Sequence, residues 1–470
     1  MFQLISRVRF LPVLLLGACS VGPDYEKKPS PVPASYKVTG LNTPPPSGSW
    51  WEGFGDRKLS QLLNQAEKAN PQARAALARL DQARAILDLR RSDLLPSLTG
   101  RALATRQQDS TRDIFPIPSD PYSRFRSTLN LSYEIDFWGR VRRSIKQQEA
   151  LSQATAADYM TALLSTKAEV ARDYLALRHL DEEIVILENA IGLREKNEQL
   201  IKSRLEAGDT TSIDHARARS QTETARAELF RVKQRRAELE NALAVLVGQN
   251  PSTFRIERAP PPRTPVVPAG VPADLLRRRP DVAATERRLA AAAEQIGITL
   301  ANYLPRVALT ASGGAAALNT SDLFQRNSRL WVVSPTVDFP LVTFGRKERA
   351  RKQAVAGYFE ALENHRDSVL RAFRDVENAL SGITNLDRAL TAQRLSTASA
   401  SEASRLIRLR YETGLSSFFE VLDAQREELQ ERRALSQTEA ARQQATVQLI
   451  QALGGEWHDH SRRQNSGDSR

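Results

Sequence analysis

An internal repeat is the feature that most restricts what this chain of 470 residues can fold into. Three landmarks recur at a constant offset of 209 residues, namely Pro71 with Pro280, Leu80 with Leu289, and Leu95-Pro96 with Leu304-Pro305. Three glycine pairs then follow at an offset of 206 residues: Gly139 with Gly345, Gly208 with Gly414, and Gly248 with Gly454. Self-similarity over this length indicates that the chain contains two copies of one structural unit.

Each copy predicts the same series of elements: a helix, two strands joined by a loop, and two long helices. Pro71 and Pro280 suit the first turn of the first helix, where a missing N–H costs nothing. The expected boundaries are 70–250 for the first repeat (hairpin about 97–138, long helices 140–207 and 211–247) and 279–457 for the second repeat (hairpin about 306–340, long helices 346–413 and 417–453).

The predicted strands alternate apolar and polar residues, which is typical of a sheet with two different faces. The clearest case is the stretch FRSTLNLSYEIDF, where apolar side chains from Phe125 to Phe137 alternate with polar ones. The alternation is weakest in the first strand, near 98–108. Pro335 is unfavourable in the fourth strand, because proline cannot donate a hydrogen bond to the ladder.

One apolar face and aromatic residues near the strand ends favour the wall of a membrane barrel. Unpaired strand edges cannot lie in hydrocarbon, and known outer-membrane barrels begin at eight strands. Four strands per chain therefore require several copies of the chain. The alternative is a soluble sheet packed on helices. It is disfavoured by the signal sequence described below and by helical stretches that would reach about 100 Å at 1.5 Å per residue.

The N-terminus has the pattern of a bacterial lipoprotein signal sequence. Arg7 and Arg9 precede an apolar stretch, and two small residues then lead to Cys19, the only cysteine in the chain. We expect residues 1–18 to be removed and Cys19 to carry a diacylglycerol and an N-acyl chain. Ser20 in the next position favours sorting to the outer membrane. The alternative, a membrane-anchor helix, needs about 20 apolar residues, far more than this stretch contains.

Composition excludes several other classes of protein. The net charge of +12 does not indicate nucleic-acid binding, because Lys and Arg alternate with acidic residues along the helical stretches. No Walker-type glycine loop or nucleophile elbow occurs, and the five histidines lack a metal-ligand spacing outside the C-terminal HDH. We expect no enzymatic activity, no metal and no cofactor apart from the covalent lipid. Residues 251–278 are rich in proline and predict an extended linker, and 458–470 predict a disordered tail.

Four motifs carry a resemblance to a known family: CSVGPDYEKKP, WWEGFGDRKLSQLL, RRRPDVAATERRLAAA and RYETGLSSFFEVLDAQ. In this order, from Cys19 to about Trp457, they resemble the TolC-like outer-membrane efflux factors, specifically the NodT-type lipoproteins. The resemblance implies a mainly α-helical homotrimer. Its twelve-stranded β-barrel would lie in the outer membrane and continue as a periplasmic α-helical barrel. The lipid-anchored N-terminal segment 19–69 and the linker 251–278 would contribute to an equatorial belt.

Short turns at Gly208 and Gly414 join the long helices and are expected to form the periplasmic mouth of the channel. Past the second turn, Glu420 and Asp423 lie one helical turn apart on one face. By resemblance, these two residues are the carboxylates of the periplasmic constriction, and Tyr411 and Arg426 hold the mouth closed. Spacing alone favours an ordinary solvated helix face, and it is the family resemblance that favours the gate.

The function that the resemblance implies is a passive exit duct in a tripartite efflux pump. Small molecules such as drugs would reach it from an inner-membrane transporter, of the resistance-nodulation-division type in NodT-like systems, through a periplasmic adaptor. One alternative is the outer-membrane component of an ATP-driven type I secretion system. A second alternative is a lipid-anchored periplasmic adaptor, which would lack membrane strands and the full-length duplication.

Overall fold

The computed structural model describes residues 20–27, 32–37, 50–110, 120–268 and 272–455. The predicted signal peptide 1–18, the predicted lipid site Cys19 and the predicted tail 458–470 lie outside the described residues. The chain forms two compact units. The first, which we call the sheet unit, contains Leu80–Thr155 and Thr285–His365 together with the described residues before Pro29. The second, the helical unit, contains the described residues of Ser30–Arg79, Ala156–Ala284 and those from Arg366 onward.

The order of elements repeats, as the sequence predicted. Helix α2 (Pro71–Ser92), strands β1 (Ser97–Gln107) and β2 (Tyr122–Ile135), and helices α3 (Arg140–Glu206) and α4 (Ser212–Leu246) form the first series. Helix α6 (Pro280–Ala301), strands β3 (Arg306–Ala317) and β4 (Arg329–Asp338), and helices α7 (Arg346–Glu412) and α8 (Phe418–Ala452) form the second. The duplicated, mainly α-helical fold class is therefore confirmed.

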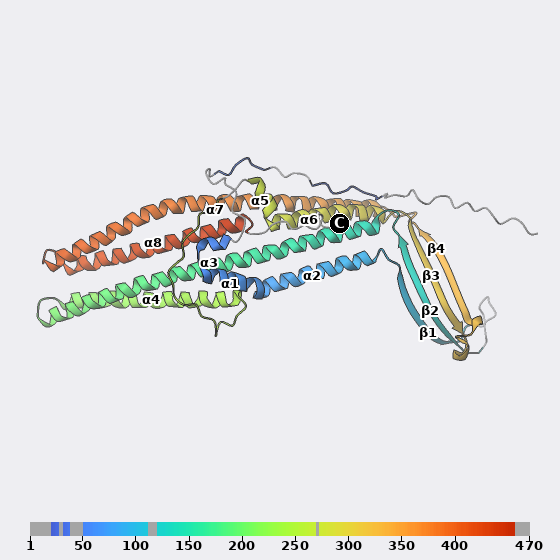
Figure 1. The fold of residues 1–470 in the computed structure, drawn as a ribbon, viewed down its shortest axis with the longest axis horizontal. Coiled ribbons are helices and arrows are strands. Elements are labelled where there is room, and N and C mark those ends of the chain that lie inside the picture. The colour runs from blue at the N-terminus through green and yellow to red at the C-terminus, as the bar shows by residue number, and fades with distance from the viewer. Residues whose placement is uncertain (1–19, 28–31, 38–49, 111–119, 269–271, 456–470) are drawn as a thin grey trace, which may run out of the picture. The chain divides into compact units, whose positions relative to one another are not determined.

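The four strands of the sheet unit form one antiparallel sheet in the order β1-β2-β3-β4 (Figure 1). The two hairpins join through β2 and β3, where Thr128 lies opposite Gly314. A side chain at Gly314 would lie 2.0 Å from the backbone oxygen of Ser127, so only glycine permits this close strand pairing. The weakly patterned first strand is present, and Pro335 lies in β4, which is an edge strand of the sheet within one chain.

The strand register separates an apolar face from a polar face. One row across the sheet, in strand order, is Leu98, Leu131, Ala311 and Val333, and the row beside it is Ser97, Ser132, Thr310 and Ser334. Directly paired residues in antiparallel strands point to the same side, so the two rows lie on opposite faces. Leu98 and Val333 are 64% and 54% exposed, and the apolar face is therefore not covered by helices as a soluble sheet would require.

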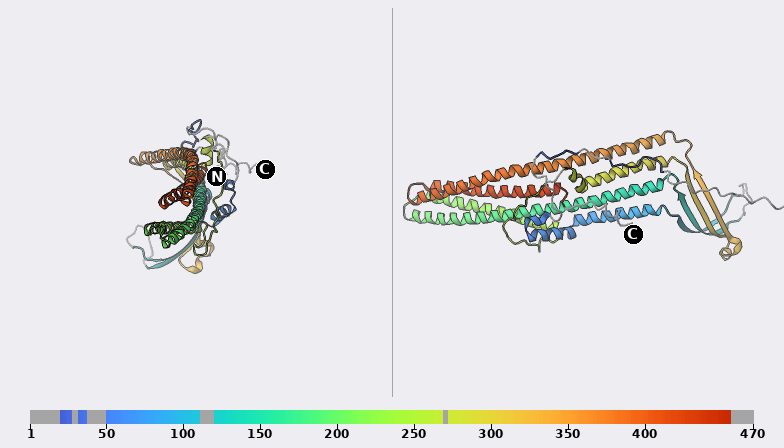
Figure 2. Two further views of the ribbon diagram at one scale, coloured as in Figure 1. Left: turned by 90° about the vertical axis from the view of Figure 1, so that its left-hand side faces the viewer. Right: turned by 45° about the horizontal axis from the view of Figure 1, so that its top comes forward.

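The helical unit contains most of the long helices and the hydrophobic core. Seen from the end that carries both turns, α7, α8, α3 and α4 follow one another in a curved row (Figure 2). The 3₁₀ helix Trp50–Phe54 and helix α1 (Arg57–Ala69) pack with α3, α4, α7 and α8 around a core that includes Trp51, Phe54, Leu62, Tyr174, Leu243 and Val376. None of the helices in the described residues has the length and apolar character that a membrane-crossing helix requires.

Two expected segments differ from their predictions. The linker 251–278 is not extended throughout, because its last seven residues form helix α5 (Pro272–Arg278). Proline is tolerated in the first turn of a helix, so Pro272 starts α5 and does not interrupt it. The predicted segment 19–69 divides between the two units: Ser20–Lys27 contact the sheet unit, and Trp50–Ala69 belong to the helical unit.

Candidate functional site

The two turns of the helical unit, at Gly208 and Gly414, have the same construction. Both glycines have positive φ angles of 86° and 74°, which a residue with a side chain rarely adopts. In each turn the residue after the glycine donates its backbone N–H to a carbonyl five residues earlier: Asp209 to Arg204 at 2.8 Å, and Leu415 to Arg410 at 2.8 Å. These are Schellman motifs, and they end α3 and α7 one residue earlier than the predicted helix ends.

Glu420 belongs to a capping box at the start of α8. The Ser417 hydroxyl accepts the backbone N–H of Glu420, and the Glu420 carboxylate accepts the backbone N–H of Ser417. Hydrogen bonds from the hydroxyls of Ser416 and Ser417 hold the pKa of Glu420 below its usual range. One of the two predicted constriction carboxylates therefore has a local structural task within its own chain.

Asp423 and Arg426 pair with each other on α8. Arg426 Nη2 lies 2.8 Å from Asp423 Oδ1, and both side chains are more than half exposed. The predicted carboxylate and the predicted arginine are thus brought together, but on one helix. The pair lies within α8 and does not connect it to another helix of the described chain, and such an exposed pair adds at most about 1 kcal/mol to stability.

Tyr411 makes the contact that joins the two helical hairpins at the turns. Arg204 Nη1, near the end of α3, donates to the Tyr411 hydroxyl at 2.7 Å, and the guanidinium lies 5.1 Å from the centre of the tyrosine ring. Phe418 also packs against Tyr411, with its ring centre 5.7 Å from that of the tyrosine. Sequence reasoning missed Arg204. Its only sequence signal is a position in the last turn before Gly208, where a cation also suits the helix dipole.

A second arginine–aromatic contact and a small core support this arrangement. Arg217 of α4 lies 5.4 Å from the ring centre of Phe419 of α8. Ile201, Ala218, Val421 and Leu422 are buried together between the hairpins. We call the group Arg204, Tyr411, Arg217 and Phe419 the tip contacts, because they link α3 and α4 to α7 and α8 beside the turns.

Further from the turns, ion pairs connect the same two hairpins. Arg433 of α8 binds Glu183 of α3 at 2.7 Å and Glu228 of α4 at 2.7 Å. The Glu183 side chain is 6% exposed, so this pair is protected from screening by salt. Removal of Arg433 would leave the buried Glu183 carboxylate without this counter-ion, which is unfavourable away from water. These ion pairs therefore form a second connection between the α3/α4 and α7/α8 hairpins, in addition to the tip contacts.

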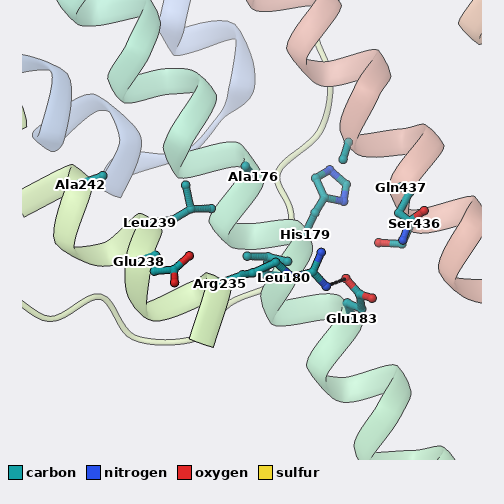
Figure 3. A pocket seen from close by; sticks show the side chains of 11 residues that line it. Ala176, His179, Leu180, Glu183, Arg235, Glu238, Leu239, Ala242, Ser436 and Gln437 are labelled. Atoms are coloured by element: carbon teal, nitrogen blue, oxygen red, sulfur yellow. Dashed lines mark ion pairs between the residues drawn. The ribbon is translucent and has the colours of Figure 1, made fainter. Parts of the chain in front are cut away.

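A cavity of about 590 Å³ lies beside this ion-pair cluster, between α3, α4 and α8 (Figure 3). Its lining includes apolar side chains of Leu180 and Leu239 and the polar groups of His179, Glu183 and Ser436. The Ser436 hydroxyl donates to Glu182 at 2.6 Å, and His179 Nε2 lies 3.2 Å from Gln443. The serine thus faces a carboxylate and not the imidazole, which is not the arrangement of a serine nucleophile with its base.

The described residues contain no cluster of three or more His, Cys, Asp and Glu side chains that could hold a metal ion. The Glu182 carboxylate, for example, lies beside hydrogen-bond donors. Hydrogen bonds from His179 and Ser436 hold its pKa below the usual range. The geometry of the helical unit is that of helical hairpins joined by side-chain contacts.

Comparison with known proteins identifies a family whose sequence model covers both repeats of the chain. The sequence model of the outer membrane efflux protein family matches residues 62–249 and 271–455, which correspond to the two repeats. The chain therefore belongs to the outer membrane efflux protein family. It is an outer-membrane efflux channel protein, as the motifs predicted.

Individual relatives match over nearly their whole length. Outer membrane protein OprJ of Pseudomonas aeruginosa is 32% identical over 460 residues, which are 96% of this chain and 95% of OprJ. The toluene efflux pump outer membrane protein TtgF of Pseudomonas putida is 31% identical over 464 residues, covering 95% of this chain and 96% of TtgF. The solved structure of the outer-membrane channel OprN superimposes with a TM-score of 0.85 at 29% identity, over 93% of this chain and 99% of OprN.

Proposed function

We propose that three copies of this chain form the passive exit duct of a tripartite efflux pump. The observation that carries the proposal is the sheet. Within the described residues, β1 and β4 each pair with one neighbouring strand only, and the apolar face of the sheet is exposed. Open edges are not tolerated in hydrocarbon, so the strands must close with those of other copies. Three copies supply twelve strands, an even number within the range of outer-membrane barrels.

The curved row of α7, α8, α3 and α4 supports the same assembly, since three such rows would form a ring of helices. The turns at Gly208 and Gly414 would then surround the periplasmic mouth, where a periplasmic adaptor and an inner-membrane transporter of the resistance-nodulation-division type would engage. Energy would come from the transporter. The duct itself would conduct drugs or other small molecules passively.

Within this assembly we assign the gate of the mouth to the tip contacts together with the predicted residues. The link between Arg204 and Tyr411 joins neighbouring hairpins of one subunit. Glu420, Asp423 and Arg426 remain the proposed constriction residues, and threefold symmetry would repeat each of them three times around the axis. A ring of exposed carboxylates favours cations, and Arg426 beside Asp423 offsets part of the repulsion.

The proposed lipid on Cys19 has a direct test. Replacing Cys19 with Ala should abolish labelling by a radioactive or clickable fatty acid in growing cells, because only the thiolate accepts the diacylglycerol. A variant that is labelled as strongly as the native protein would contradict the acylation. The mobility of the band in gel electrophoresis reports in parallel whether the signal sequence has been removed.

The exit-duct proposal is tested by crosslinking in cells. A photoreactive amino acid would replace Thr413, which is exposed in the turn between α7 and α8, and captured proteins would be identified by mass. We expect an adaptor and an inner-membrane transporter. The same substitution at Lys352, an exposed residue at the start of α7, is the matched control. Capture of this chain alone at position 413, with an assembled trimer present, would contradict the proposed function.

A further inference from the structure

The first described residues of the chain, Ser20–Lys27, lie across α3 and α6 in the sheet unit. We call them the N-terminal strap. At its beginning, the backbone N–H of Val21 donates to the Trp138 carbonyl at 3.2 Å. Ser20 is packed against Gly139, where an added side chain would lie 2.9 Å from the serine oxygen. Gly139 has a φ of 76°, so the turn from β2 into α3 needs glycine for its backbone as well as for this contact.

Arg143 of α3 holds the middle of the strap. Its Nη2 donates to the Gly22 carbonyl at 2.9 Å, and its Nη1 donates to the Pro23 carbonyl at 3.2 Å. The same Nη1 lies 2.8 Å from Glu294 of α6, and the Arg143 side chain is only 1% exposed. A buried guanidinium needs acceptors for its donors, and two of the acceptors here are backbone oxygens of the strap.

Two glycines make room for this contact. Gly22 has a φ of 109°, and a side chain there would lie 2.7 Å from the backbone of Gly297 in α6. A side chain at Gly297 would in turn lie 2.4 Å from Cδ of Arg143. The strap, α6 and the guanidinium thus meet at distances that any larger residue would prevent. Such close packing indicates a specific seat for the strap on these two helices.

Glu286 of α6 holds the other end of the strap. Its carboxylate accepts hydrogen bonds from the Tyr25 hydroxyl at 3.1 Å and from Lys27 Nζ at 3.2 Å, and its side chain is 7% exposed. Tyr25 also packs against Ala150, Ala290 and Ala291. The strap is therefore held at its beginning, middle and end, and is not a flexible linker.

We propose that Arg143 is the positioning residue of the membrane anchor, a role that rests on the proposed acylation of Cys19. Cys19 directly precedes Ser20 in the sequence, and Ser20 is packed against Gly139 at the start of the strap. Arg143 therefore fixes the acyl chains beside the junction of β2 and α3. The lipid enters the membrane at a defined place next to the sheet.

Hydrogen exchange on the full-length, processed protein in lipid nanodiscs tests whether Arg143 holds the strap. The readout is deuterium uptake in the N-terminal peptide, whose mass also reports the lipid on Cys19. In Arg143→Met the Val21 amide should exchange about tenfold faster, equivalent to about 1.4 kcal/mol in the opening equilibrium. Arg143→Lys, which keeps the charge but not the fork of donors, should give an intermediate rate. Arg142→Met is the matched control, because Arg142 pairs with Asp136 and not with the strap.

Gly22→Ala keeps the test decisive if the Arg143 variants do not fold, because it changes neither helix. It should release the strap while α3 and α6 keep their protection. If the strap amides exchange at the same rate in the native protein, Gly22→Ala and Arg143→Lys, the proposed role of Arg143 is overturned. An N-terminal peptide without the lipid mass would instead overturn the acylation, so the two failures are distinguishable.

The position of the lipid itself is measured with a diazirine-bearing fatty acid that cells incorporate into the protein. In the native protein, the crosslinks that light forms between the acyl chain and protein should fall mainly on peptides around Trp138, because the strap begins there. In Gly22→Ala the crosslinks to protein should spread to other peptides. The same distribution in both proteins would overturn the proposed positioning role.

Discussion

Tyr411 illustrates how much a single side chain at the tip depends on its partner. Its hydroxyl is bonded by Arg204, which lies 207 residues earlier in the chain. A hydrogen bond to a charged donor contributes about 1.5–3 kcal/mol, and the cation–π contact adds about 0.5–1 kcal/mol at an exposed site. The neighbouring pair of Asp423 and Arg426 lies within one helix and cannot hold two hairpins together.

We predict that Tyr411→Phe raises the conductance or open probability of the reconstituted channel about tenfold, because it removes the hydrogen bond and leaves the ring, a loss of at least about 1.4 kcal/mol. Arg204→Met, which also removes the cation–π contact, should have a larger effect. Single-channel recording in planar bilayers measures both. Arg405→Gln is the control, since Arg405 pairs with Glu402 on its own helix. Native conductance in both tip variants would contradict the gate assignment.

A pH dependence is expected at Glu420. Its pKa is lowered from 4.5 in the folded chain, so the ionised carboxylate stabilises the start of α8 above pH 4.5. This stabilisation is lost as the pH falls through the lowered pKa. Hydrogen-exchange protection of the first turn of α8 should therefore be constant above pH 4.5 and decrease below it.

Glu420→Gln is the matched control for this pH dependence. Glutamine can still close a capping box, but it has no proton to gain in this range. Protection in the variant should not change with pH after correction for the intrinsic exchange rate. An identical acid-induced loss in both proteins would show that another group is responsible.

At the scale of elements, the two turns decide where α3 and α7 end and where α4 and α8 begin. Gly208 and Gly414 have open space around the position of a Cβ atom, so the cost of a substitution there is in the backbone alone. The left-handed conformation costs a residue with a Cβ atom about 1–2 kcal/mol. The repeated Schellman motifs are therefore a backbone requirement, which explains why the repeat preserves these glycines.

Gly414→Ala should lower the local free energy of opening of the turn between α7 and α8 by about 1–2 kcal/mol, measured by hydrogen exchange. Gly192→Ala is the control with the opposite sign. Gly192 lies inside α3 with nothing within 4 Å of the added Cβ atom, so alanine should stabilise the helix by up to about 1 kcal/mol. A stabilising effect of Gly414→Ala would contradict the assigned backbone strain.

At the scale of the whole molecule, assembly depends on the faces of the sheet. Val333 and Ser334 are neighbours in β4 but belong to opposite faces, since Val333 is in the row of Leu98 and Ser334 in the row of Ser97. In the proposed barrel the apolar face meets lipid and the polar face meets the lumen. The two positions therefore form a matched pair for testing membrane insertion.

Val333→Lys should reduce the amount of heat-resistant oligomer in outer-membrane fractions, because a lysine in the middle of the lipid face costs about 2–4 kcal/mol per subunit. Ser334→Lys should assemble at close to the native level. The measurement is gel electrophoresis of unheated membrane samples, with the mass of the native complex determined separately. Equal loss in both variants, or a native complex of two copies, would contradict the proposed trimeric barrel.

The sequence by itself determined the features that arise from local chemistry. The repeat, the prolines at the starts of α2 and α6, the positive-φ glycines at the turns and the strand alternation are all visible without a structure, because each depends on a few consecutive residues. The long helices consequently begin and end within about one residue of their predicted positions. The four motifs likewise identified the family that the comparisons show.

Only the tertiary structure decided which distant residues meet. No local pattern distinguishes Arg143 from the many other arginines of the helical stretches, and Arg204 differs from them only by its place in the last turn of α3. Arg204 becomes a tip contact because the turns bring the ends of α3 and α7 together, and Arg143 is buried because the strap and α6 cover it. The pairing of β2 with β3, which joins the two repeats in one sheet, is likewise a long-range contact. Such contacts depend on how the whole chain packs, and sequence periodicity carries no information about that packing.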